Sequence, residues 1–278
     1  MTYDVLGAGA LDYAPCRYGN SRLLFRGPER RLDAPYVAFL GGTSTYGKFI
    51  KTPFPALVES DLGVNCVNFG ICNAGVDVLT NDGFIADTCN GASATVIQVV
   101  GAQNLSNRFY TVHPRRNDRF VSASRLLKSI YPEVDFAEFH FNKHMLSCLY
   151  EVSKQRFAVV RDELQNAWTA RMKLLTKRIE SKVVLVWFAD HAPLRSEPVG
   201  LDPAQSRTPL FVTREMLDEL RQSVAELVEV VATPEATAAG TEGMVFSQME
   251  AMAAAEMLGP KAHGEVAVKL GEALHKLV

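Results

Sequence analysis

The sequence predicts a three-layer α/β/α fold around a mostly parallel sheet of five strands. Two observations predict it. Short apolar runs rich in β-branched and aromatic residues have the character of buried strands, and helical patterns alternate with them. The five runs are residues 36–40, 64–69, 94–100, 183–188 and 227–231. Alternation of this kind implies βαβ units with right-handed crossovers, and therefore a sheet covered by helices on both faces.

Helices are expected between these strands and after the last of them. They are residues 53–62, 76–88, a long stretch from about 142 to 180, 213–224, and two more at the carboxyl end. Ligands bind such sheets in the crevice beyond the carboxyl ends of the strands. The segments that directly follow the strands are therefore the places to look for a site.

The chain is expected to form one α/β domain. It has 278 residues, of which 47% are apolar, enough for one large core. Residues 1–35 are predicted to be an irregular N-terminal extension packed on a domain of residues 36–278. Within that domain we expect a long Arg-rich loop at 102–121 and a helical insertion at 122–180.

Composition favours a small-molecule partner over nucleic acid or a membrane. The formal net charge is −2, so no global positive field attracts polyanions. The five cysteines lack CxxC spacing, and the amino terminus lacks the basic and apolar regions of a signal peptide. We therefore expect a cytoplasmic protein with no membrane span. No cofactor or metal is expected, because His140 and His144, although four residues apart, do not form an HExxH motif and have no evident third ligand.

Three glycine-containing turns follow the first three predicted strands. They read GGTSTYG from Gly41, NFGICNAG from Asn68 and GAQN from Gly101. A small-residue turn between a strand and a helix can present a hydroxyl and backbone N–H groups to a developing oxyanion. Each turn alone is weak evidence, but three at one sheet edge favour a site there.

These turns resemble the blocks of the SGNH (GDSL-like) hydrolase family. Gly41-Gly42-Thr43 falls where that family has Gly-Asp-Ser, Gly70 resembles the glycine of the second block, and Gly101 and Asn104 resemble the third block. His263, before a final helix, is similar to the family's catalytic histidine.

The resemblance implies a flavodoxin-like sheet and ester hydrolysis or acyl transfer. Thr43 or Ser44 would be the nucleophile, Gly70 and Asn104 would donate to the oxyanion, and His263 would be the general base. Two departures separate the chain from the family pattern. Thr43 stands at the serine position, and Pro260 stands where the family commonly has the aspartate that orients the histidine. Asp190, Glu256 or a backbone carbonyl could replace that aspartate.

An Arg-rich run at residues 106–120 follows Asn104. Its guanidinium forks suit phosphate, sulfate or carboxylate oxygens, so the run suggests an anionic substrate. The candidate substrate-binding residues are Arg108, His113, Arg115 and Arg116. The alternative is a solvated loop whose arginines pair with surface acids.

Two other functions stay open. The fold could be retained as a catalytically degenerate binding or accessory module, because the triad is incomplete. The turn from Gly42 to Lys48 could also hold a phosphate or nucleotide, although Phe49 breaks the Walker pattern. Asp190 and His191, after the fourth strand, could offer an acid and a base, but the opening of a polar loop explains them equally well.

Overall fold

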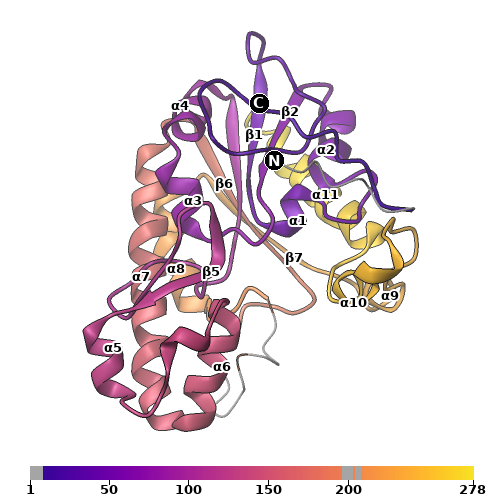
Figure 1. The fold of residues 1–278 in the computed structure, drawn as a ribbon. Helices are drawn as coiled ribbons and strands as arrows, with labels where there is room; N and C mark the ends of the chain where they lie inside the picture. The colour runs from indigo at the N-terminus through magenta and orange to yellow at the C-terminus, as the bar shows by residue number, and fades with distance from the viewer. Residues whose placement is uncertain (1–8, 196–202, 204–207) are drawn as a thin grey trace.

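The central sheet has five parallel strands in the order β2-β1-β3-β6-β7 (Figure 1). The computed structural model describes residues 9–195, 203 and 208–278. The strands are β1 (Tyr36–Gly41), β2 (Asn65–Gly70), β3 (Ala94–Gln98), β6 (Lys182–Ala189) and β7 (Glu226–Val231). The five predicted strands are confirmed, and their order is the flavodoxin-like one.

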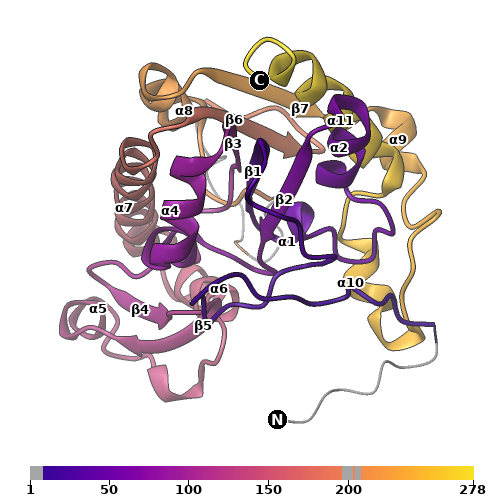
Figure 2. The same ribbon diagram turned by 90° about the horizontal axis from the view of Figure 1, so that it is seen from above.

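Helices cover both faces of the sheet (Figure 2). One face carries α3 (Val76–Asn81), α4 (Gly83–Gly91), α7 (Lys154–Arg178) and α8 (Arg214–Leu220), and the other carries α2 (Phe54–Leu62) and α11 (Pro260–Leu274). Successive β1 side chains alternate between two cores, because strand residues point to opposite faces. Val37 and Phe39 pack with Val266 of α11, whereas Ala38 and Leu40 belong to the core that contains Trp168 of α7.

The segment from β3 to α7 differs from the expected loop. It contains an antiparallel hairpin of β4 (Tyr110–His113) and β5 (Arg116–Ala123), followed by α5 (Arg125–Ile130) and α6 (Asn142–Val152). Tyr110, Val112 and Phe120 are buried on the inner face of the hairpin. This two-residue period is a strand signal that the density of arginines obscured.

The remaining short helices lie at the carboxyl edge of the sheet and in the C-terminal part of the chain. They are α1 (Thr43–Tyr46), α9 (Pro234–Ala238) and α10 (Ala251–Ala255). In Figure 1, α9 and α10 lie on the opposite side of the molecule from α5 and α6. The carboxyl ends of the strands point toward the space that these two groups of helices flank.

The segment before β1 packs on the sheet through aromatic side chains. Cys16 and Phe25 form an antiparallel bridge. The ring of Phe25 meets that of Phe69 on β2 edge-on, with centroids 5.0 Å apart, and Tyr18 contacts both rings. The aromatic contacts tie the segment to the carboxyl end of β2.

Arg26 fixes the connection between α1 and α2. Its side chain is buried, and its guanidinium donates to the carbonyls of Tyr46, Gly47, Ile50 and Lys51 at 2.6 to 3.2 Å. The guanidinium also lies over the ring of Tyr13, 5.3 Å from its centroid. One cation therefore joins four carbonyls of this connection, of which that of Gly47 also accepts from Ile50 N at 3.0 Å.

Replacing Arg26 with Met is expected to lower the free energy of unfolding by about 3 kcal/mol or more. Met keeps much of the apolar stem but removes the hydrogen bonds that the guanidinium donates to the four carbonyls, two of them in buried contacts. Chemical denaturation of the full chain measures the loss. Arg22→Met is the matched control, because Arg22 is exposed, and equal stability of the two variants would contradict the role given to Arg26.

Candidate active site

Gln98 at the end of β3 holds the turn that follows β1. Its Oε1 accepts from Gly42 N at 3.1 Å, Thr45 N at 3.1 Å and Thr45 Oγ1 at 2.6 Å, and its side chain is buried. A Cβ on Gly41 would lie 2.1 Å from Thr45 Oγ1 and 2.7 Å from Gln98 Oε1. The first glycine of the turn is therefore required by the close approach of β1 to this amide.

Thr43 begins α1 at the carboxyl edge of the sheet and is half-buried. Its Oγ1 accepts from the N–H of Asn73 at 2.9 Å and lies 3.3 Å from Asn73 Oδ1. Asn73 follows β2, and its Nδ2 donates to Asp118 Oδ2 on β5 at 3.3 Å. Residues from β1, β2 and the hairpin thus meet at one exposed point.

Asn104 reaches the same point from the segment after β3. Its Nδ2 donates to the carbonyl of Asn73 at 3.3 Å, and its Oδ1 accepts from Asn142 Nδ2 at 3.1 Å. Asn73 therefore links Thr43 with Asn104. Sequence reasoning selected these two residues but missed Asn73, Asp118 and Asn142, which carry no family motif.

Gly70 does not offer the free N–H group that was expected of an oxyanion donor. Its N–H donates to Asn68 Oδ1 at 2.8 Å. A Cβ at this position would lie 2.2 Å from Tyr46 N, so the glycine is needed for the close packing of α1 on β2. Ser44, the other candidate nucleophile, is half-buried beside Thr43.

His263 is not placed as a general base. It lies in the first turn of α11 and is 1% exposed, between the rings of Phe54 and Phe188. Its Nδ1 accepts from the backbone N–H of Phe54 at 3.1 Å, a group at the start of α2 that the helix leaves unpaired. Burial, together with the charge of Arg26, lowers the pKa of His263 to about 3. The neutral imidazole therefore acts as a cap for α2.

The four candidate anion-binding residues of the hairpin region differ in their surroundings. Arg108 forms an ion pair with Glu163, with Nε 2.6 Å from Oε2. This residue therefore fits the alternative in which the arginine pairs with an acid. His113 Nδ1 accepts from Arg115 N at 3.3 Å within the hairpin turn. Arg115 and Arg116 are exposed. Arg116 lies two residues before Asp118 on β5, in a stretch where the pairing with β4 is irregular.

A second polar pair lies at the carboxyl end of β6. His191 Nδ1 is 2.7 Å from Asp190 Oδ1. The Nε1 of Trp187 donates to the carbonyl of His191 at 2.7 Å, and the two rings meet edge-on. An imidazole held by an adjacent carboxylate has the orientation that a general base needs.

Cys72, beside Asn73, is not an activated thiol. Burial raises its pKa to about 11, although the charge of Lys48 opposes the shift. The thiol therefore stays protonated at neutral pH and is a poor nucleophile.

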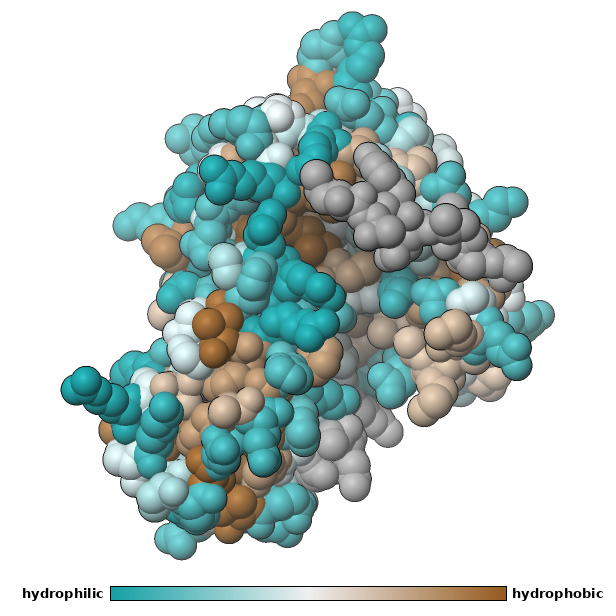
Figure 3. All heavy atoms as spheres, viewed as in Figure 1, coloured by the Kyte–Doolittle hydropathy of each residue, from teal (hydrophilic) through white to brown (hydrophobic). Residues whose placement is uncertain are grey.

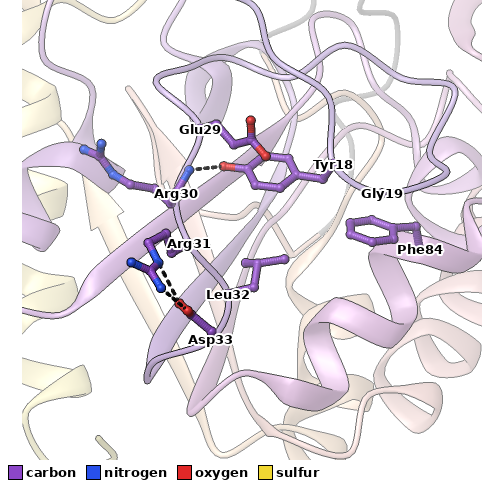
Figure 4. Close-up of a pocket in the computed structure, with 8 residues that line it drawn as sticks. All are labelled: Tyr18, Gly19, Glu29, Arg30, Arg31, Leu32, Asp33 and Phe84. Carbon is purple, nitrogen blue, oxygen red and sulfur yellow. Dashed lines mark hydrogen bonds and ion pairs between the residues drawn. The ribbon is translucent and has the colours of Figure 1, made fainter.

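Two cavities lie away from this edge. A cavity of about 720 Å³ lies between the N-terminal segment and α4, with Tyr18, Arg31 and Phe84 among its walls (Figure 4). Another of about 420 Å³ lies between α2 and α11. At the carboxyl edge the surface is hollowed between the lobe of α5 and α6 and that of α9 and α10 (Figure 3).

In the part of the chain that the structure describes, no group of three or more His, Cys, Asp or Glu side chains is placed to hold a metal ion. No helix among the described residues has the length and apolarity needed to cross a membrane.

Replacing Gln98 with Leu is expected to lower the free energy of unfolding by about 2 to 4 kcal/mol. The change leaves two backbone N–H groups and the Thr45 hydroxyl without their buried acceptor. Gln98→Glu restores an acceptor and should recover part of the loss. Denaturant titration of both variants measures the difference, and a Leu variant as stable as the wild type contradicts the prediction.

The depressed pKa of His263 predicts a pH dependence of stability. An unfolded histidine titrates near 6.5, so between about pH 6.5 and 3 the unfolded chain binds one more proton than the folded chain. Stability should therefore be retained above about pH 6.5 and fall as the pH drops through this window. In His263→Asn, the slope of unfolding free energy against pH should decrease by about one proton.

Comparison with known proteins adds the family of the chain. The solved structure of the lipase Lip_vut3 from a goat rumen metagenome is 13% identical over 88% of this chain and 98% of its own, with a TM-score of 0.42. A structure assigned to the lipolytic G-D-S-L family, from Desulfitobacterium hafniense DCB-2, is 13% identical over 88% of this chain and all of its own, with a TM-score of 0.40. The search of curated proteins found no match. A family model described as a domain of unknown function, DUF6473, matches residues 1–278, and the chain therefore belongs to that family.

Proposed function

We propose that the carboxyl edge of the sheet binds a small anionic ester and promotes its hydrolysis or the transfer of its acyl group. The observation that carries the proposal is the meeting of Thr43 and Asn104 at Asn73. The SGNH resemblance selects the same two positions for a hydroxyl and an oxyanion donor. The proposal therefore has support from both the sequence blocks and the contacts.

The carbonyl oxygen of the ester would lie against the donors of this edge. Asn104 Nδ2 makes only a long bond to the Asn73 carbonyl, at 3.3 Å, so it can turn to a better acceptor. Among the described residues no acceptor pairs with the N–H of Thr43. Donors that are already oriented stabilise a developing oxyanion without reorganisation, and this is a large contribution to ester chemistry.

The proposed proton acceptor is His191, held by Asp190, rather than the buried His263. β3 lies between β1 and β6, so the ends of β1 and β6 are about 10 Å apart by strand spacing. That gap suits a bound ester and an attacking group. His191 would take the proton of a water molecule or of an acceptor hydroxyl as its oxygen attacks the carbonyl carbon, and the proton would then pass to the leaving alkoxide.

The Thr43 hydroxyl is assigned to positioning of the ester. Its hydrogen-bonding partner is the neutral Asn73 amide, which cannot remove a proton to make an alkoxide. The negative group of the substrate would lie toward the exposed Arg116 at the start of β5.

A second candidate function is binding without turnover. Two groups expected to take part in catalysis, the Gly70 N–H and His263 Nδ1, are already paired within the chain. The nucleotide alternative is less favoured, because Gly42 N and Thr45 N donate to Gln98 and are not free to surround a phosphate.

Turnover of short-chain aryl esters bearing a carboxylate tests the proposed chemistry. His191→Ala is expected to lower kcat by about two to four decades, because it removes the general base. Asn104→Ala should lower it by about two to three decades. His263→Asn, which keeps an acceptor for Phe54 N, should stay within a few fold of wild type. Loss of turnover in the His263 variant alone would refute the assignment of the base, and binding of the esters without turnover in wild type would select the second candidate.

The position of the anionic group is tested by binding. Arg115→Gln with Arg116→Gln is expected to raise the Kd of the carboxylated ester about tenfold or more, and the effect should shrink at high salt. Arg108→Gln is the matched control, since Glu163 already occupies that guanidinium. An unchanged Kd in the double variant would show that the tip of the hairpin is a solvated surface and not an anion-binding site.

A further inference from the structure

Asn142, the first residue of α6, lies directly behind Asn104. It is fully buried, and its Nδ2 donates to Asn104 Oδ1 at 3.1 Å and to the carbonyl of Asn117 at 2.5 Å. Its own Oδ1 is buried with no hydrogen-bond partner among the described residues. A buried amide oxygen left unpaired lowers stability, so packing alone does not explain an asparagine at this place.

The contact determines which end of the Asn104 amide faces the site. One hydrogen of Asn142 Nδ2 is directed to the Asn117 carbonyl and the other to the amide of Asn104. Because a hydrogen needs an acceptor, the atom of Asn104 that it meets must be the oxygen. The Nδ2 of Asn104 is then left on the side of Asn73 and Thr43. A flipped amide would bring two NH2 groups together and turn an acceptor toward the substrate oxygen.

The hairpin anchors this arrangement. Asn117 on β5 is buried, and its Oδ1 accepts from Gly75 N at 3.1 Å and Val78 N at 3.0 Å. Its carbonyl is one of the two acceptors of Asn142. The hairpin and α6 are therefore joined to the turn after β2 and to Asn104 by one chain of amide groups.

We propose that Asn142 is a positioning residue that orients the Asn104 amide with its N–H groups toward the carbonyl oxygen of the substrate. The proposal rests on the ester chemistry proposed above. Asn142 does not touch the substrate and acts through Asn104 alone. Its effect should therefore appear in the transition state, where the oxyanion develops, more than in the binding of the ester.

The first test is the kinetic effect of Asn142→Asp. A carboxylate cannot donate, repels Asn104 Oδ1 and favours the flipped amide. We expect kcat to fall about tenfold or more with KM changed less than about threefold. In an Asn104→Ala background the same substitution should have no further effect on kcat, because the residue through which it acts is gone. An Asn142→Asp enzyme with wild-type kcat, or an effect that persists without Asn104, would overturn the proposal.

A second measurement does not depend on turnover. The side-chain NH2 resonances of Asn104, assigned by their loss in Asn104→Asp, should shift in Asn142→Asp. They should stay near their wild-type positions in Asn107→Ser, a control on the same segment whose Oδ1 bonds Phe109 N and Tyr110 N. Unshifted Asn104 resonances in Asn142→Asp would refute the positioning role. If wild type turns over no ester while the shift is observed, the proposed function fails and the orientation stands.

Asn142→Leu covers the case in which the aspartate variant does not fold. Leu removes the donor without adding a charge and also removes the unpaired oxygen, so the folded state should be kept. We expect the same loss of kcat with a Tm no more than a few degrees below that of wild type. Wild-type kcat in a folded Leu variant would equally overturn the proposal.

Discussion

The geometry of the site depends on one oxygen atom. Gln98 Oε1 accepts three hydrogen bonds from the turn between β1 and α1, and all four participating groups are buried. A single acceptor shared by three donors restricts the turn to one conformation, because any other leaves polar groups unpaired in a medium that penalises them. The strand β3 thereby controls the position of Thr43, which lies in the turn that follows β1. The amide is neutral, so this control does not change with pH.

Around that fixed turn, amide groups link most of the other polar groups, and the Asp118 carboxylate bonds Asn73 at the exposed rim. Asn73, Asn104, Asn117 and Asn142 form successive contacts from the exposed rim to the buried start of α6. An amide both donates and accepts, so each member of such a chain constrains the orientation of the next. Ion pairs such as that of Arg108 with Glu163 lie outside the chain. The arrangement keeps the site polar without placing an unpaired charge in the core.

The sequence was sufficient to predict the layers, the five strands and the turns after them, because buried parallel strands produce apolar runs that are visible without a structure. It also selected Thr43 and Asn104, both of which contact Asn73 in the structure. It misassigned His263. The sequence around a histidine at the start of the last helix looks the same whether the side chain faces a substrate or caps the neighbouring helix. The hairpin of β4 and β5 was not predicted, because its many arginines resemble those of a polar loop. Asn73, Gln98 and Asn142 could not be found, because single amides have no period and their roles arise from contacts between residues 25 or more positions apart.

The carbonyls that Arg26 holds belong to the connection that carries α1 into α2, while the arginine itself precedes the first strand. The first strand begins at residue 36, but a chain that started there would lack Arg26, the cation that holds the connection between β1 and β2. Circular permutants offer a way to use this dependence. New ends placed in the exposed stretch around residues 28 and 29 would move Arg26 to the far end of the chain. The protein would then have to recruit that side chain as the last step of synthesis, and the crossover would stay open until then.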